Sequence, residues 1–181
     1  SSDKEIEDVL RKVKDELDKL ARALDESLKR SEKDIDRLEE ELKESHDRTR
    51  EEIRKLIEER NVDKLAEDMK RKLKESLKEA REVVDEVRKR LERSRREIEK
   101  MIKKLEEDLR TLERKVREVI KRGRLGDELI REIKKVLDRI REEIERLLRE
   151  DEELLERLRE DAKRILDKNK ELLDELRRRV K

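Results

Sequence analysis

Apolar residues recur along the chain in a pattern that repeats every eighteen residues. Five positions in each repeat are usually apolar, which corresponds to one core position per 3.6 residues, the period of an undistorted α-helix. A seven-residue repeat would produce a left-handed supercoil and an eleven-residue repeat a right-handed one. A period between these two predicts nearly straight helices. Columns of residues that share one position include Ile6/Leu24/Leu42, Met69/Val87/Leu105 and Ile140/Leu158/Leu176.

Two short stretches interrupt this pattern and divide the chain into three segments. Asn61 suits the left-handed residue that ends a helix, and Asp63 suits the cap of the next one. Gly123 and Asp127 have the same two roles at the second interruption. Connections this short make neighbouring helices antiparallel. The sequence therefore predicts an all-α, up-down-up three-helix bundle, one domain over 1–181, with helices at 2–60, 63–122 and 127–181.

The composition is extreme but agrees with long helices. Asp, Glu, Lys and Arg make up 61% of the chain, and there is no aromatic residue, no Pro and no Cys. High charge with few aromatics is also the composition of disordered chains, but those lack apolar periodicity and are rich in helix breakers. This chain has two glycines and a regular apolar period, so the composition favours long helices.

The charge pattern argues against several classes of partner. There are 56 basic and 55 acidic residues, and the two signs are interspersed along the chain. No broad positive field is therefore expected to hold nucleic acid or an anionic membrane. No apolar run approaches the roughly 18 residues that a membrane-spanning helix needs. We expect a soluble protein with no nucleic-acid and no membrane partner. The absence of Cys leaves the redox compartment open.

Some core columns change from apolar to polar residues at matching heights. The short turns align residue i of the first helix with about 123 − i of the second and 126 + i of the third. One apolar layer then contains Val13, Leu112 and Ile133. One repeat further along, the same columns carry the residues that we call the first polar layer, which are Ser31, Ser94 and Asp151.

A second group of polar residues lies another repeat along the same columns. We call it the second polar layer; its residues are Thr49, Ser76 and Asn169, with His46 one turn away and Ser45 beside it. A buried polar group costs a few kcal/mol unless it is hydrogen-bonded. Grouped polar residues can satisfy one another, and they can fix helix register because a slipped helix leaves them unpaired. The alternative interpretation is that both layers are boundary positions wetted by solvent.

His46 is the single histidine, and its neighbours argue against a catalytic or metal role. Leu42 and Lys43 precede it by one turn, and without Cys or a second His it lacks metal-ligand partners. Ser76, His46 and Asn169 have the residue types of a nucleophile, a base and an orienting group. However, a close-packed bundle offers neither an oxyanion hole nor a substrate pocket. We therefore expect no catalytic, metal or cofactor-binding residue and no cofactor.

The column of Leu10 and Leu28 places His46 toward the interior, which predicts its protonation behaviour. A neutral imidazole has one donor and one acceptor, which the hydroxyls and amide of the second polar layer can match. Protonation would remove the acceptor and bring a charge into a partly desolvated layer. Both effects predict a folded-state pKa below about 6.5.

These features together resemble the de novo designed, parametrically generated three-helix bundles of the untwisted, eighteen-residue-repeat type. The resemblance covers the whole chain and rests on the repeat, the turns at Asn61 and Gly123, the aromatic-free core and the charged surface. It implies a monomeric structural scaffold with no evolved ligand and no required partner. The polar layers are a departure from the plainest such bundles, and we expect them to set helix register.

Two other functions stay open at this stage. The chain could be an interaction or switch module in which the third helix exchanges with a partner helix, because that helix carries extra apolar pairs such as Leu147–Leu148 and Leu172–Leu173. It could also be a designed metal or catalytic bundle, although the residues around His46 argue against this function.

Agreement between local helix propensity and the core pattern predicts high stability. Strong helix formers fill all three segments, and breakers are confined to the interruptions. We predict a thermal midpoint above about 90 °C, measured by circular dichroism at 222 nm, the usual helix wavelength. A cooperative transition below about 70 °C would show that the polar layers cost more than this argument allows.

Overall fold

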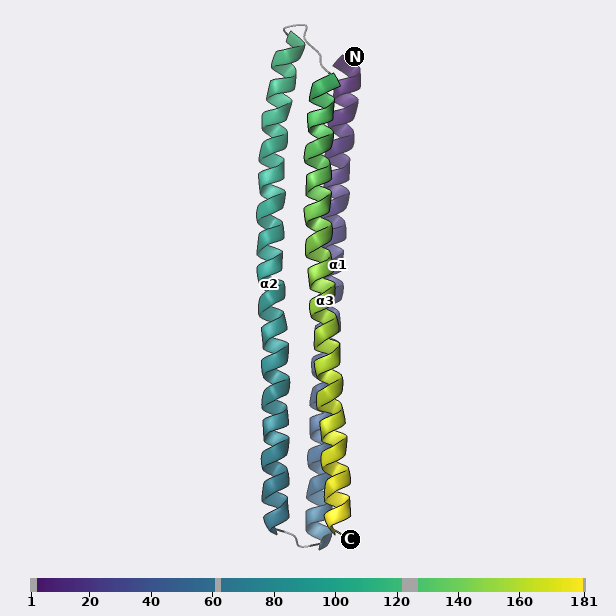
Figure 1. Cartoon of the computed structure of the whole chain (residues 1–181), viewed down its shortest axis with the longest axis vertical. Coiled ribbons are helices and arrows are strands. Elements are labelled where there is room, and N and C mark those ends of the chain that lie inside the picture. The colour runs from purple at the N-terminus through teal and green to yellow at the C-terminus, as the bar shows by residue number, and fades with distance from the viewer. Residues whose placement is uncertain (1–2, 61–62, 122–126, 181) are drawn as a thin grey trace. The chain divides into compact units, whose positions relative to one another are not determined.

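The computed structural model describes residues 3–60, 63–121 and 127–180. They form three α-helices that pack against one another (Figure 1). Helix α1 spans Asp3–Arg60, α2 spans Asp63–Lys121 and α3 spans Asp127–Val180. The predicted all-α three-helix bundle is confirmed, and the predicted helix ranges agree with the described residues. The turn residues Asn61 and Gly123, and positions 2, 122 and 181 of the predicted helices, lie outside the described residues.

The helices consist of residues that favour this conformation. Leu, Glu, Lys and Arg dominate all three, and no Pro interrupts them. Their apolar residues lie on one side of each helix, so each helix needs neighbours to remove that side from water. Within the described residues no helix is long and apolar enough to cross a membrane.

The chain divides into two compact units, and each unit contains a segment of all three helices. Unit 1 comprises residues 1–29 and 91–151, and unit 2 comprises residues 30–90 and 152–181. The division therefore cuts across the helices and does not separate one helix from the others. That the whole chain acts as one domain stays a prediction.

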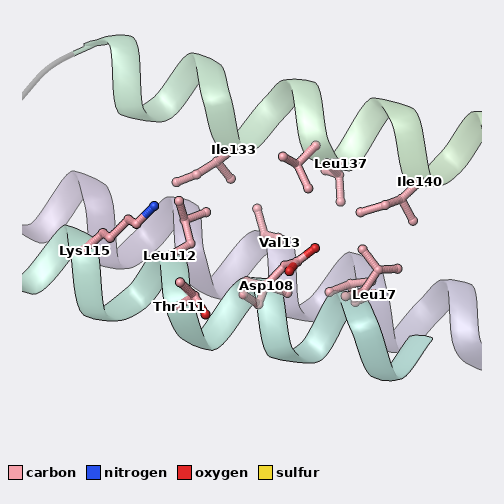
Figure 2. Close-up of a pocket in the computed structure, with 12 residues that line it drawn as sticks. Val13, Leu17, Asp108, Thr111, Leu112, Lys115, Ile133, Leu137 and Ile140 are labelled. Atoms are coloured by element: carbon pink, nitrogen blue, oxygen red, sulfur yellow. The ribbon is translucent and has the colours of Figure 1, made fainter. Parts of the chain in front are cut away.

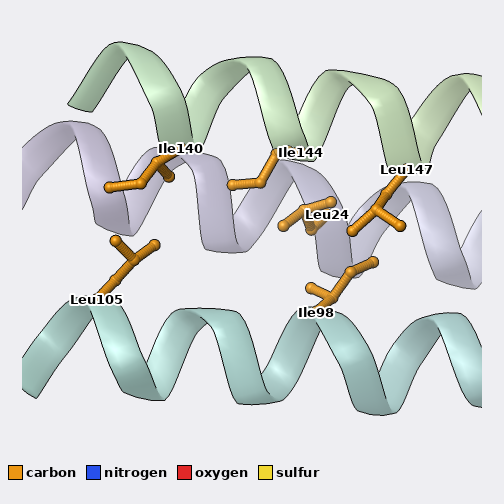
Figure 3. Close-up of a cluster of buried hydrophobic side chains, with 6 residues drawn as sticks. All are labelled: Leu24, Ile98, Leu105, Ile140, Ile144 and Leu147. Carbon is orange, nitrogen blue, oxygen red and sulfur yellow. The ribbon is translucent and has the colours of Figure 1, made fainter. Parts of the chain in front are cut away.

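The core of unit 1 consists of aliphatic side chains from all three helices. Leu24 of α1 lies among Ile98 and Leu105 of α2 and Ile144 and Leu147 of α3 (Figure 3). Nearer the start of α1, a second cluster is built in the same way; it contains Ile6, Leu10, Val13, Val116 and Ile133. As the residue number rises in α1, its partners fall in α2 and rise in α3. Within unit 1, α2 is therefore antiparallel to the other two helices.

Unit 2 repeats this arrangement with other residues. Ile53 of α1 packs with Met69 and Leu73 of α2 and with Leu172 and Leu176 of α3. The end of α1 thus meets the start of α2 and the end of α3. Asp36 of α1 contacts Arg88 of α2, and Asp34 of α1 contacts Arg159 of α3. Within unit 2, α2 is therefore antiparallel to α1 and α3.

The eighteen-residue columns identified the core. Every described residue of these columns is buried or half-buried, and Met69, Leu158 and Leu176 have no exposed surface. Val136, which belongs to no column, is the one large apolar residue with substantial exposure, 39%, among the described side chains. The core positions are therefore confirmed, whereas the straightness of the helices over their whole length stays a prediction.

Truncation of one core residue should be costly. Leu24 is 1% exposed at the centre of its cluster. Leu24→Ala should lower the free energy of unfolding by about 2–5 kcal/mol, because the lost methyl groups leave a cavity. Guanidinium chloride unfolding measures this change. Val136→Ala is the surface control and should change the value by less than about 0.5 kcal/mol. Equal effects of the two substitutions would contradict the assignment of the core.

Candidate functional site

The first polar layer contains a buried hydrogen bond between two helices. Ser94 of α2 donates its hydroxyl proton to Oδ2 of Asp151 on α3, with an oxygen–oxygen distance of 3.0 Å. Ser94 is 9% exposed and Asp151 is 8% exposed, so both lie within the core of unit 1. The predicted interhelical hydrogen bond to the Asp151 carboxylate is confirmed.

Ser31, the α1 member of the first polar layer, is also buried. It is 6% exposed and belongs to unit 2, whereas Ser94 and Asp151 belong to unit 1. The burial of all three residues argues against the interpretation that these are solvent-wetted boundary positions. That they form one layer of three residues stays a prediction.

The buried Asp151 carboxylate carries an electrostatic penalty. Burial raises the pKa of Asp151 above its ordinary value, because the ionised form loses solvation. The hydrogen bond from Ser94 opposes this shift, and the negative charges of Glu150 and Glu97 add to it. The Ser94 hydroxyl thus only partly offsets the cost of burying the carboxylate.

Asn169 is the centre of the second polar layer. Its Oδ1 accepts a hydrogen bond from the Ser76 hydroxyl at 2.8 Å, and its Nδ2 donates to the Ser45 hydroxyl oxygen at 3.1 Å. Ser45 lies on α1, Ser76 on α2 and Asn169 on α3. Asn169 itself is 3% exposed. One buried carboxamide therefore connects all three helices within unit 2.

The sequence analysis noted Ser45 beside His46 but did not predict that it would be a hydrogen-bond partner in this layer. It occupies no core column and is half-buried at the edge of the apolar stripe. The signal that could have identified it is its size. Most positions flanking the stripe carry long charged side chains, and a serine there leaves room for a partner to approach. A column analysis overlooks such flanking positions.

Thr49 and His46 do not take part in this hydrogen-bonded group as predicted. The Thr49 hydroxyl donates to the backbone carbonyl oxygen of Ser45 on its own helix, at 2.7 Å. Nδ1 of His46 is buried and has no hydrogen-bond partner among the described residues. The expected matching of the imidazole with the layer's hydroxyls and amide is therefore wrong for Nδ1. The carboxamide of Asn169 bonds the hydroxyls of Ser45 and Ser76 instead, so the hydrogen bonds between helices in this layer are made without the imidazole.

The environment of His46 nevertheless shifts its pKa as the sequence predicted. Burial lowers the pKa of His46 below 6.5, because the imidazolium would lose solvation in the half-buried site. The carboxylate of Asp47 opposes the shift, and the guanidinium groups of Arg50 and Arg81 add to it. The imidazole is therefore neutral at physiological pH.

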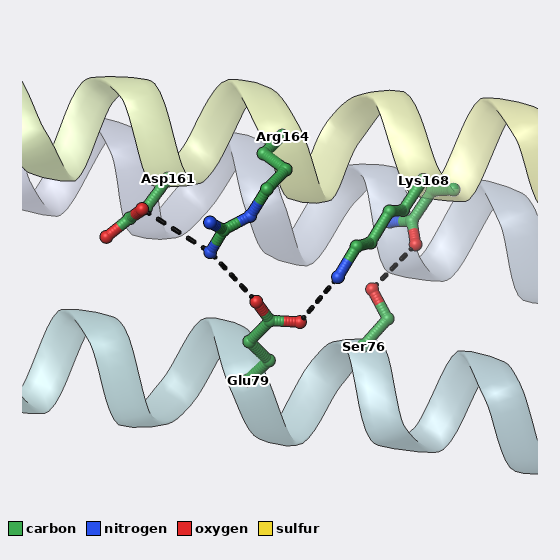
Figure 4. A network of polar contacts seen from close by, with 6 residues as sticks. Ser76, Glu79, Asp161, Arg164 and Lys168 are labelled. Atoms are coloured by element: carbon green, nitrogen blue, oxygen red, sulfur yellow. Dashed lines mark hydrogen bonds and ion pairs between the residues drawn. The ribbon is translucent and has the colours of Figure 1, made fainter.

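Charged residues flank the second polar layer on its α2–α3 side. Glu79 of α2 pairs with Arg164 and Lys168 of α3, at 3.0 and 3.2 Å (Figure 4). A cavity of about 290 Å³ is lined there by Ser76 and Asn169 together with Lys72, Glu79 and Lys168, so the expectation that close packing leaves no pocket at this layer is wrong. The hydrogen bond between Ser76 and Asn169 is thus buried at Asn169 but approaches solvent at Ser76.

The geometry of the second polar layer does not activate a nucleophile. The Ser76 hydroxyl proton is directed at the amide oxygen of Asn169 and not at an imidazole nitrogen. An amide oxygen is too weak a base to accept that proton during an attack. Among the described residues, no group of three or more His, Cys, Asp or Glu side chains could hold a metal ion.

The lowered pKa of His46 predicts a loss of stability in mild acid. The unfolded chain takes up a proton near pH 6.5, before the folded protein does, so the free energy of unfolding should fall below that pH and be unaffected well above it. NMR titration of the single histidine measures the folded pKa directly. Arg81→Gln should raise this pKa, and Asp47→Asn should lower it further. A folded pKa at or above 6.5 would contradict the buried placement.

The raised pKa of Asp151 predicts that the free energy of unfolding changes with pH in the opposite direction to the change predicted for His46. The folded protein keeps this proton to higher pH than the unfolded chain, so the free energy of unfolding falls as the pH rises from 3.8 through the folded pKa. Asp151→Asn retains an oxygen acceptor for Ser94 and removes the charge. It should stabilise the protein at pH 7, with a gain that vanishes below pH 3.8. Chemical unfolding at several pH values measures this gain.

An exposed substitution is the control for the Asp151 experiment. Asp18→Asn on the surface of α1 should leave the free energy of unfolding nearly unchanged at pH 7. A loss of stability in Asp151→Asn at neutral pH would mean that the carboxylate, and not merely an oxygen acceptor, is required.

Comparison with known proteins identifies no relative. No protein-family model matches the chain, and no curated protein or solved structure shows a significant similarity to it.

Proposed function

We propose that this protein is a designed structural scaffold whose buried polar residues fix the register of its helices. The observation that carries the proposal is the pair of hydrogen bonds at Asn169, which accepts one from the Ser76 hydroxyl and donates one to the Ser45 hydroxyl oxygen. These bonds join three helices at one level of a mostly aliphatic core. The regular eighteen-residue repeat and the absence of matching families support a designed origin.

A repeating core makes helix register a real problem for this chain. Leu, Ile and Val occupy equivalent positions in successive turns, so a helix displaced by one turn would still bury apolar side chains. Apolar packing alone therefore discriminates weakly between registers. Displacement of α3 would separate Asn169 from both serines, and a buried unpaired polar group costs about 1–3 kcal/mol. Asn169 thus penalises the wrong registers more than it stabilises the right one.

Ion pairs between helices support the same arrangement on the surface. Arg88 of α2 contacts Asp36 and Glu39 of α1 at 2.7 and 2.8 Å, and Arg177 of α3 contacts Glu52 of α1 at 2.7 Å. Each exposed pair stabilises by at most about 1 kcal/mol. These ion pairs favour one alignment of the helices over others, because a displaced helix would bring different charges opposite one another.

The alternative function is a switch in which α3 leaves the bundle and binds a partner. The extra apolar residues of α3 motivate it, but Leu172 is 7% exposed and Leu173 packs against the same cluster of unit 2. These side chains therefore already pack against the core of unit 2, which favours the scaffold over the switch. Hydrogen exchange distinguishes the two functions, since a scaffold protects all three helices equally and a switch exposes α3 first.

Spin labels test the role of the polar residues in register. The chain has no cysteine, so Glu44→Cys on α1 and Lys170→Cys on α3, both at exposed positions, place two nitroxides uniquely. The parent protein should give one narrow distance distribution by pulsed electron resonance. Replacing the hydrogen-bonded group by Ser45→Ala, Ser76→Ala and Asn169→Leu should broaden it or add a population displaced by about one turn, roughly 5.4 Å.

The control keeps the polar group and removes another serine. Ser27 is half-buried in unit 1, away from the second polar layer in sequence, and Ser27→Ala should retain the narrow distribution. A single narrow distribution in the triple variant would mean that apolar packing sets the register alone, and the proposed role of Asn169 would fail.

A further inference from the structure

The core of unit 1 contains a partly open cavity of about 220 Å³ between the three helices. Ile133, Leu137 and Ile140 of α3 point toward it from one side, and Val13 and Leu17 of α1 lie across from them (Figure 2). Its remaining lining residues come from α2 and the outer face of α3; they are Leu105, Asp108, Leu109, Thr111, Leu112, Lys115 and Val136.

Incomplete packing explains why this cavity exists. Leu109 shares its column with Leu73 and Leu91, which are 3% and 5% exposed, yet Leu109 itself is only half-buried. Leu137 shares its column with Leu155, which is 6% exposed, and is likewise half-buried. Of the leucines in these two columns, Leu73, Leu91 and Leu155 are buried, Leu109 and Leu137 are half-buried beside this cavity, and Leu173 of unit 2 is also half-buried. Val136, the most exposed large apolar residue among the described side chains, also lines this cavity.

The chemistry of the lining selects an uncharged, apolar ligand. Nine of the twelve lining residues are Leu, Ile or Val. The other three offer little to a polar molecule, because Asp108 and Lys115 carry opposite charges and the Thr111 hydroxyl already donates to the Glu107 carbonyl oxygen. Water entering the apolar part would find few hydrogen-bond partners. Apolar cavities of about 150 Å³ bind benzene, so this cavity is large enough for a small hydrocarbon.

We propose that this cavity of unit 1 is a binding site for small uncharged hydrocarbons, such as single-ring aromatics. Burial of the ligand removes its surface and that of Leu109, Leu112 and Leu137 from water, which drives binding. No directional polar contact is required, so selectivity follows size and the absence of charge.

Toluene is a suitable probe, because the chain contains no aromatic residue apart from the imidazole of His46. Saturation-transfer NMR should show contact between the protein methyl groups and the toluene ring. Titration followed in the methyl region of a carbon–proton spectrum should shift the methyl signals of Leu112, Leu137 and Ile140. The expected dissociation constant is about 1 mM, which is reasonable for a ligand with about seven non-hydrogen atoms.

A cavity-filling substitution tests the location of the site. Leu137→Phe should weaken toluene binding at least about tenfold, because the added ring occupies the cavity. Leu173→Phe is the matched control, since Leu173 occupies the same helical column in the core of unit 2, and it should leave the affinity unchanged. Circular dichroism establishes that each variant is folded, and Leu109→Phe replaces Leu137→Phe if the latter unfolds.

Other outcomes overturn the proposal. Unchanged affinity in a folded, cavity-filled variant would place toluene elsewhere. Methyl shifts distributed over both units, or equal weakening by Leu173→Phe, would indicate nonspecific partitioning into the core. Tighter binding of benzoate than of toluene would show that Lys115 selects an anion, and the assignment to uncharged ligands would be wrong.

Discussion

Burial of one apolar stripe per helix is the constraint on which this structure depends. Charged residues make up 61% of the chain, and there are no aromatic side chains, disulfides or described metal groups to supplement the aliphatic core. Side chains such as Leu24, Met69 and Leu158 must therefore provide most of the driving force, and they can do so only when three helices surround them. The exposed ion pairs of the charged surface add little stability.

The polar residues inside the bundle differ in where they find hydrogen-bond partners, and there are three cases. Ser94 with Asp151, and Asn169 with its two serines, find partners on other helices. Thr49 satisfies its hydroxyl on the preceding turn of its own helix, which provides no information about register. His46 leaves a buried nitrogen unpaired and stays neutral. Only a hydrogen bond to another helix can distinguish one helix alignment from another.

The sequence by itself determined the helices, their approximate ends and the core. A period of 3.6 residues has one structural solution, and the strong helix formers agree with it, so local and global preferences coincide. It also identified Ser94, Asp151, Ser76 and Asn169 as interior polar residues, because each interrupts an apolar column. Tertiary structure decided which atoms pair. Ser45 became a partner of Asn169 although it lies outside every column, and His46 was excluded although it lies within one. The cavity beside Leu137 was likewise invisible in the sequence, because an equivalent leucine, Leu155, is closed off. Column position fixes the direction of a side chain, but hydrogen-bond partners and packing gaps depend on how closely the helices approach one another, which no periodicity encodes.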